Sequence, residues 1–234
     1  MSSERTLSEK ALEVNDILNG GYRDLEASFN SLNISEDDFR DLFTNTEYMD
    51  TIFGGSPSRS AGWYFRRCME NLLARFPNSG EYIIENSNED RVVYACLSGG
   101  FYDDIKTLNR VALWEHMPES QLYAVRLCSI KTLRETISSK NSKVRTIAFE
   151  RLGPVECIGE MLEDSIAKNR ELGARYAPYG YKPLSEMTNE IARSVFGLIV
   201  SKIDIQYLPM MLANRNIKNK WQSKMIEERL NRGY

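Results

Sequence analysis

Long apolar runs are missing from this 234-residue chain. No stretch of 18 or more apolar residues occurs, and a helix that crosses a bilayer needs about 20. The first residues, MSSERTLSEKALEVND, are charged and lack the apolar core of a secretory signal peptide. We therefore predict no contact with a membrane and a cytoplasmic location.

Metal ligands are also scarce. The chain contains one histidine, His116, and four cysteines without a C-x-x-C pair, a pattern that gives little support for a zinc site. Each cysteine lies among apolar neighbours, as in VVYACL and VRLCSI, which favours a buried reduced thiol. Their separations of 28, 32 and 29 residues are consistent with equivalent places in stacked helices: Cys68, Cys96, Cys128 and Cys157.

Catalytic motifs are absent as well. The segment GGSPSRS has no Lys-Ser/Thr after its glycines and no strand before it, which argues against a P-loop. No G-x-S-x-G or zinc-protease motif occurs, and the pairs Asp103-Asp104 and Glu227-Glu228 fit solvated helix faces. We expect no enzyme, no cofactor and no metal site, with an enzyme of unrecognised type as the third alternative for the function.

Charge is distributed unevenly, although the formal net charge is only −3. Residues 1–117 contain 20 Asp/Glu and 11 Lys/Arg, whereas residues 118–234 contain 13 Asp/Glu and 19 Lys/Arg. One interpretation is that two oppositely charged halves of one fold attract each other. The other is that the C-terminal half presents a basic surface to an anionic partner.

Helical periodicity is what the sequence does contain, along most of its length. Residues 7–19 place Leu7, Ala11 and Val14 on one helical face. Ser35 precedes three acidic residues, as an N-cap does. The runs YII and VVYACL are β-prone, but no hairpin turn joins them, so we predict helices over 81–98. The predicted fold class is all-α, an antiparallel helical array.

The clearest break in the pattern is the loop Gly54-Gly55-Ser56-Pro57-Ser58. It predicts an acidic helical segment over residues 1–53 and a helical-repeat-like domain over residues 60–234, or one continuous domain made of both. In the C-terminal part, short turns separate predicted helices at 103–116, 118–137, 141–153, 154–164, 165–177, 184–202, 203–213 and 219–234.

Three segments of the C-terminal half can be aligned: LYAVRLCSIKTL (122–133), SKVRTIAFERLG (142–153) and NEIARSVFGLIV (189–200). Each has a small or β-branched residue followed by arginine. With an L-P-x-L-like helix around Pro209, the pattern over about residues 88–230 resembles HEAT-like repeats, the two-helix units of α-solenoids.

Two features depart from the HEAT pattern. The usual Asp before the V-R pair is absent, and Val125 and Val144 are only 19 residues apart, whereas the resemblance implies units of roughly 40–47 residues. The sequence therefore predicts either a HEAT-like α-solenoid or an irregular antiparallel helical array.

The basic residues of the aligned segments have two interpretations. An arginine early in a helix of a stacked unit can bond a neighbouring turn. Alternatively, the basic residues form a ladder that contacts phosphates, as the resemblance to HEAT-like DNA glycosylases implies, although a pI near 5.5 argues against strong nucleic-acid binding. The members of this predicted ladder are Arg126, Arg145, Arg193, Lys168, Arg170, Lys218 and Lys220.

The segment YAPYGYKPL is a further candidate. Tyr179 and Tyr181 suit interface anchors, and they equally suit a loop folded over helix ends. Together these features predict a non-enzymatic module that binds a protein partner, as an adaptor, assembly factor or inhibitor. The alternative is a nucleic-acid-binding protein, and the oligomeric state stays open. The content of Asn, Ser, Tyr and Met also resembles that of bacteriophage proteins.

Overall fold

The computed structural model describes residues 5–19, 25–53, 61–99, 104–217 and 219–232. These residues contain sixteen α-helices and three short 3-10 helices, and no strand occurs among them. The predicted all-α fold class is confirmed. The chain divides into two compact units, residues 1–132 and 133–234, and the predicted loop at 54–58 lies outside the described residues.

The described residues of the first unit contain nine helices and the start of a tenth. Helices α1 and α2 pack against α5, and α7 packs against both α5 and α9. The prediction of helices over 81–98 is confirmed by α6 and α7. The helices are α1 (Leu7–Asn19), α2 (Leu25–Ser31), α3 (Glu36–Thr44), α4 (Thr46–Phe53), α5 (Ala61–Arg75), α6 (Ser79–Asn86), α7 (Asp90–Ser98), α8 (Ile105–Val111), α9 (Pro118–Val125) and α10 (Ile130–Thr136).

The second unit alternates longer and shorter helices. Helices α11, α13, α14 and α16 contain 10 to 13 residues each, and shorter helical pieces connect them. The order is α11 (Ser142–Leu152), η1 (Pro154–Cys157), α12 (Ile158–Glu163), α13 (Ala167–Tyr176), η2 (Lys182–Glu186), α14 (Arg193–Lys202), η3 (Ile205–Tyr207), α15 (Leu208–Leu212) and α16 (Lys220–Arg232).

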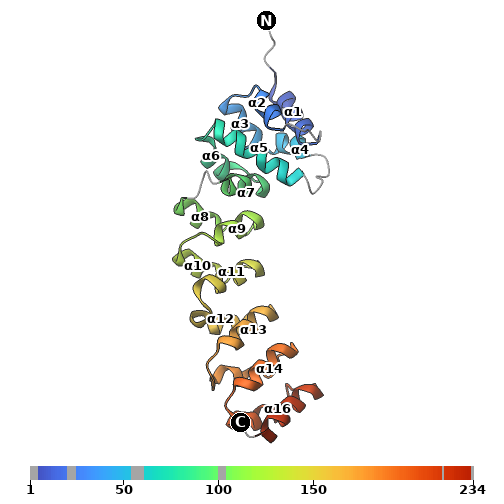
Figure 1. Cartoon of the computed structure of the whole chain (residues 1–234), viewed down its shortest axis with the longest axis vertical. Coiled ribbons are helices and arrows are strands. Elements are labelled where there is room, and N and C mark those ends of the chain that lie inside the picture. The colour runs from blue at the N-terminus through green and yellow to red at the C-terminus, as the bar shows by residue number, and fades with distance from the viewer. Residues whose placement is uncertain (1–4, 20–24, 54–60, 100–103, 218, 233–234) are drawn as a thin grey trace. The chain divides into compact units, whose positions relative to one another are not determined.

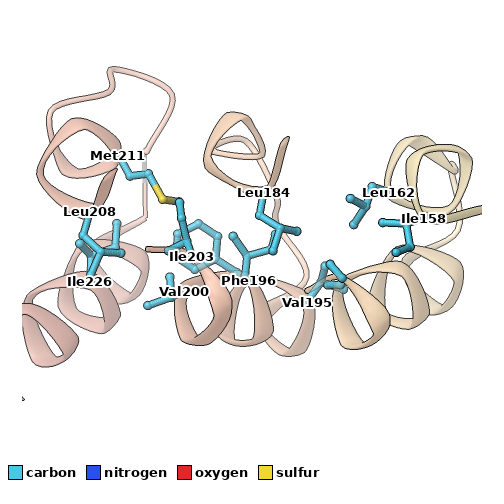
Figure 2. Close-up of a cluster of buried hydrophobic side chains, with 13 residues drawn as sticks. Ile158, Leu162, Leu184, Val195, Phe196, Val200, Ile203, Leu208, Met211 and Ile226 are labelled. Carbon is cyan, nitrogen blue, oxygen red and sulfur yellow. The ribbon is translucent and has the colours of Figure 1, made fainter. Parts of the chain in front are cut away.

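The core of the second unit lies between these two kinds of helix. Helix α13 packs against α12 and α14, and α14 packs against α16, so the longer helices follow one another (Figure 1). Figure 2 shows buried side chains between α12, η2 and α15 on one side and α14 and α16 on the other. Among them, Phe196 and Leu184 are fully buried.

The helices of the second unit recur at an interval shorter than a HEAT unit. Helices α11, α13, α14 and α16 begin at residues 142, 167, 193 and 220, whereas the HEAT resemblance implies a repeat of roughly 40–47 residues. Each interval holds one longer helix and one set of shorter helical pieces.

Two helices predicted as continuous are broken. The predicted helix 118–137 ends with α9 and starts again at α10, because the Ser129 hydroxyl accepts the Thr132 N–H as an N-cap would. The predicted helix 184–202 is interrupted between η2 and α14. There the Glu190 carboxylate accepts the Ala192 N–H at 2.7 Å, which starts α14 late.

Candidate binding surfaces of the second unit

Arg145, the fourth residue of α11, is held by hydrogen bonds to a carboxylate and to a backbone carbonyl. Its Nε and Nη2 donate to the Asp164 carboxylate at 2.7 and 3.0 Å. Its Nη1 donates to the Ser139 carbonyl at 2.8 Å. Asp164 in turn accepts the Ile166 N–H at 2.7 Å, just before α13. The arginine therefore joins the start of α11 to the start of α13.

Arg170 repeats this arrangement 25 residues later in the chain. Its Nε and Nη2 donate to the Glu190 carboxylate at 2.5 and 3.1 Å, and its Nη1 donates to the Asp164 carbonyl at 2.8 Å. Glu190 accepts the Ala192 N–H before α14, as Asp164 accepts the Ile166 N–H before α13. We call these two sites the arginine–carboxylate pairs.

Both carboxylates are almost completely buried, with 2% of each side chain exposed. Burial raises the pKa of Asp164, but hydrogen bonds from Arg145 and the Ile166 N–H outweigh it, and the net pKa is lowered. The pKa of Glu190 is lowered in the same way, since Arg170 and the Ala192 N–H outweigh its burial. Arg145 and Arg170 thus hold the helices together, which is the structural one of the two predicted interpretations.

The structure does not place the arginines of the predicted ladder at equivalent positions in their helices. Arg126 follows the last residue of α9 and belongs to the first unit, whereas Arg145 is the fourth residue of α11 and Arg193 is the first of α14. The aligned pairs occupy different places in their helices, because the sequence pattern alone does not show at which residue each helix begins. Lys218 lies outside the described residues.

A different set of cations does occupy equivalent places. Each of the four longer helices of the second unit has an exposed lysine or arginine as its first or second residue. None of the four side chains forms a hydrogen bond or ion pair with any residue that the structure describes. We call this set the cationic row; its members are Lys143, Lys168, Arg193 and Lys220.

Contacts between neighbouring first turns place these four helix starts along one edge. Thr146 Oγ1 of α11 donates to Asn169 Oδ1 of α13 at 2.8 Å. Arg170 of α13 donates to Glu190, which lies three residues before the start of α14. The Glu190 carbonyl accepts a hydrogen bond at 2.7 Å from Gln222 Nε2 in the first turn of α16. The cationic row therefore follows the N-terminal ends of the four longer helices.

The cationic row is electrostatically unfavourable for the helices that carry it. A helix N-terminus has a partial positive charge, so an acidic residue there stabilises the helix and a cation destabilises it by about 0.3–1 kcal/mol. None of α11, α13, α14 and α16 has an acidic residue in its first turn. Helix stability therefore does not explain the recurrence of cations at this place. Lys143 was missed from the sequence because the ladder was anchored on Arg145.

The predicted tyrosine loop is partly fixed on α16. Arg229 of α16 donates to the Tyr179 hydroxyl at 3.3 Å and to the Ile203 carbonyl at 2.6 Å, and its guanidinium lies 5.9 Å from the centre of the Tyr179 ring. Tyr179 nevertheless remains 66% exposed, whereas Tyr181 packs against the core of the second unit. Tyr181 is therefore a packing residue, and Tyr179 keeps an exposed ring.

The remaining candidates from the sequence are one histidine and four cysteines. The His116 ring lies 5.7 Å from the Trp114 ring. All four cysteines are buried and free, as predicted, and burial raises the pKa of Cys96 to about 12. They do not occupy equivalent places, since Cys96 lies within α7 and Cys157 ends η1. Among the described residues, no group of three or more His, Cys, Asp or Glu side chains is placed to hold a metal ion.

The described residues contain no single helix that is long and apolar enough to cross a membrane. Helix α14 and the segment Ile205–Leu212 meet these two criteria only when taken together, across a bend of 117°. No family model, no curated protein and no solved structure matches this chain.

Proposed function

We propose that the chain is a non-enzymatic binding module whose second unit contacts the phosphodiester backbone of a nucleic acid through the cationic row. The observation that carries this proposal is the recurrence of an exposed, unpaired cation at the starts of the four longer helices of the second unit, where it costs stability. A charge pattern that opposes helix stability at every repeat is accounted for by a ligand of opposite charge.

The regularity of the row favours a polymer with evenly spaced charges. Packed helices lie roughly 8–10 Å apart, so four successive cations would extend over roughly 25–30 Å. A lysine or arginine contacts phosphate by charge, and such contacts position a protein without reading the base sequence. We therefore expect binding without sequence preference. The second unit supplies the required excess of positive charge, with 17 Lys/Arg against 12 Asp/Glu.

The test is the salt dependence of binding to a fluorescently labelled oligonucleotide, followed by anisotropy. Four phosphate contacts predict a slope of log K against log salt of roughly −4 for duplex and −3 for single-stranded DNA. Replacing Lys143, Lys168 and Lys220 by alanine should weaken binding and reduce the slope by about one for each lysine removed. Separate duplex and single-strand probes identify which form is bound.

A matched control removes the same charge elsewhere in the second unit. Lys182, Arg215 and Arg232 are exposed and lie away from the first turns of the four longer helices, so their triple alanine variant should keep most of the slope. Equal losses in both triple variants, or no binding at 50 mM salt, would contradict the proposal. If polyglutamate competes for the cationic row as well as unlabelled DNA does, the ligand is an acidic protein and not a nucleic acid.

A further inference from the structure

A groove with the opposite charge lies among the shorter helical pieces of the second unit. Its volume is about 540 Å³, and α12, η2 and the segment before α14 contribute most of its lining. Gly159 of α12 lies at this groove, and a Cβ atom added there would meet no atom within 4 Å. The backbone is therefore open to an incoming chain at this place.

The charge of the groove is negative. Glu163 at the end of α12 and Glu186 at the end of η2 both line it, and both are exposed. Neither forms an ion pair with a residue that the structure describes. Arg170 and Glu190 also line the groove, but they neutralise each other in their buried pair. Two uncompensated carboxylates therefore face whatever enters.

Apolar side chains accompany these two carboxylates. Ile191 lines the groove and is 77% exposed, and Tyr181 and Met187 line it while half-buried. Ile191 has a large apolar side chain, and most of it is exposed to solvent beside the groove.

A second groove of about 370 Å³ continues this surface on the other side of η2. Glu186 lines both grooves. The second groove is lined by Tyr207 and by Met210, which is 71% exposed. The exposed Lys182 also lines the second groove and offsets the charge of Glu186 there, so the negative charge of this surface belongs to the first groove.

We infer that the first groove binds an extended segment of a protein partner that carries apolar side chains together with lysine or arginine. Charge complementarity with Glu163 and Glu186 selects the basic residues, and Ile191 and Met187 select the apolar ones. The two carboxylates repel phosphate, so a nucleic acid on the cationic row does not compete for this groove. This inference is independent of the proposed function, because it rests on other residues of opposite charge.

The probe is a labelled 12-residue peptide of alternating Leu and Lys, titrated into the full chain and followed by anisotropy. Two comparison peptides replace Lys by Glu or Leu by Ser. We expect the Leu/Lys peptide to bind most tightly. The double variant E163Q/E186Q should weaken its binding about five- to tenfold, since each exposed carboxylate contributes a small charge interaction.

The control variant is E227Q/E228Q, which removes two exposed carboxylates of α16 and leaves the grooves intact. It should bind the Leu/Lys peptide within about twofold of the unaltered chain. Ile191→Ser should weaken the Leu/Lys peptide more than the Ser/Lys peptide, because only the first loses an apolar contact. Equal weakening by both double variants, or equal binding of the Leu/Lys and Ser/Lys peptides, would overturn the inference.

Discussion

Six helices of the first unit and the four longer helices of the second unit start in opposite ways. In the first unit, α1, α3, α4, α6, α7 and α9 each have an acidic residue in the first turn. In the second unit, the four longer helices have none and start instead with the cationic row. These six helices of the first unit follow the preference of the helix dipole, whereas α5 and α8 have no acidic residue in the first turn and α8 has the exposed Lys106 as its second residue. The second unit departs from the preference at the same place in every longer helix.

Helix α3 of the first unit and helices α13 and α14 of the second also differ in how the N–H groups at their starts are satisfied. Helix α3 has a complete capping box, in which Ser35 and Asp38 bond each other's backbone N–H. Helices α13 and α14 lack a side-chain cap on their N-cap residues, Ile166 and Ala192. Buried carboxylates held by arginine accept those two N–H groups instead. The starts of α13 and α14 therefore rely on contacts between helices, whereas the start of α3 relies on a local cap.

The largest expected effect comes from breaking an arginine–carboxylate pair. Asp164→Asn or Glu190→Gln leaves a buried arginine without its charge partner. Loss of one partner from a fully buried pair costs about 3–5 kcal/mol. Arg145 and Arg170 retain 12% and 18% side-chain exposure, so we expect about 2–3 kcal/mol in the free energy of unfolding, measured in urea.

Glu156→Gln serves as the control for this prediction. It breaks the pair between Arg134 and Glu156, whose side chains are 58% and 57% exposed, and we expect a loss within about 1 kcal/mol. A loss of similar size in all three variants would show that the buried pairs do not hold the second unit together.

The same two carboxylates predict the response of stability to acid. The pKa values of Asp164 and Glu190 are lowered by folding from ordinary values of 3.8 and 4.5. The unfolded chain therefore binds more protons in this range, so their stabilisation is present above about pH 5 and is lost as the pH falls through the folded pKa values. The free energy of unfolding should decrease between about pH 5 and pH 2.

The double variant D164N/E190Q should lose less stability than the unaltered chain over this pH range. Some dependence should remain, because folding also lowers the pKa values of Asp38 and Asp104 in the first unit. Identical pH profiles for the variant and the unaltered chain would place the acid sensitivity outside the second unit.

The smallest expected effect tests the helix starts themselves. Replacing Lys143, Lys168 or Lys220 by glutamate should raise the free energy of unfolding by about 0.3–1 kcal/mol each, because the new charge suits the helix dipole. The reverse change in the first unit, Glu119→Lys at the exposed second residue of α9, should lower it by a similar amount. Changes of the same sign in both units would remove the contrast between them.

Local patterns predicted much of the fold. The helix at 7–19 and the cap at Ser35 depend on residues within one or two turns, and both appear as expected. The breaks near Ser129 and Glu190 were missed. The break at Glu190 depends on Arg170, which lies 20 residues away in the sequence. A period of 3.6 residues in the apolar positions contains no information on contacts of this kind.

The candidate sites were predicted less well, because the distinction between a paired and an unpaired cation is a tertiary one. Arg170 and Lys168 are two residues apart and both belong to the predicted ladder, yet Arg170 is held by Glu190 and Lys168 is exposed. The missing acidic residues in the first turns were visible in the sequence, but only the helix starts given by the structure bring Lys143 into the same set as Lys220.

The central claim is that the cationic row is maintained for binding at the expense of stability. The most direct measurement takes the triple variant K143E/K168E/K220E and determines its melting temperature and its oligonucleotide affinity in the same buffer. We predict a higher melting temperature together with loss of binding. A higher melting temperature with unchanged affinity would contradict the claim, since the row would then cost stability without contacting the ligand.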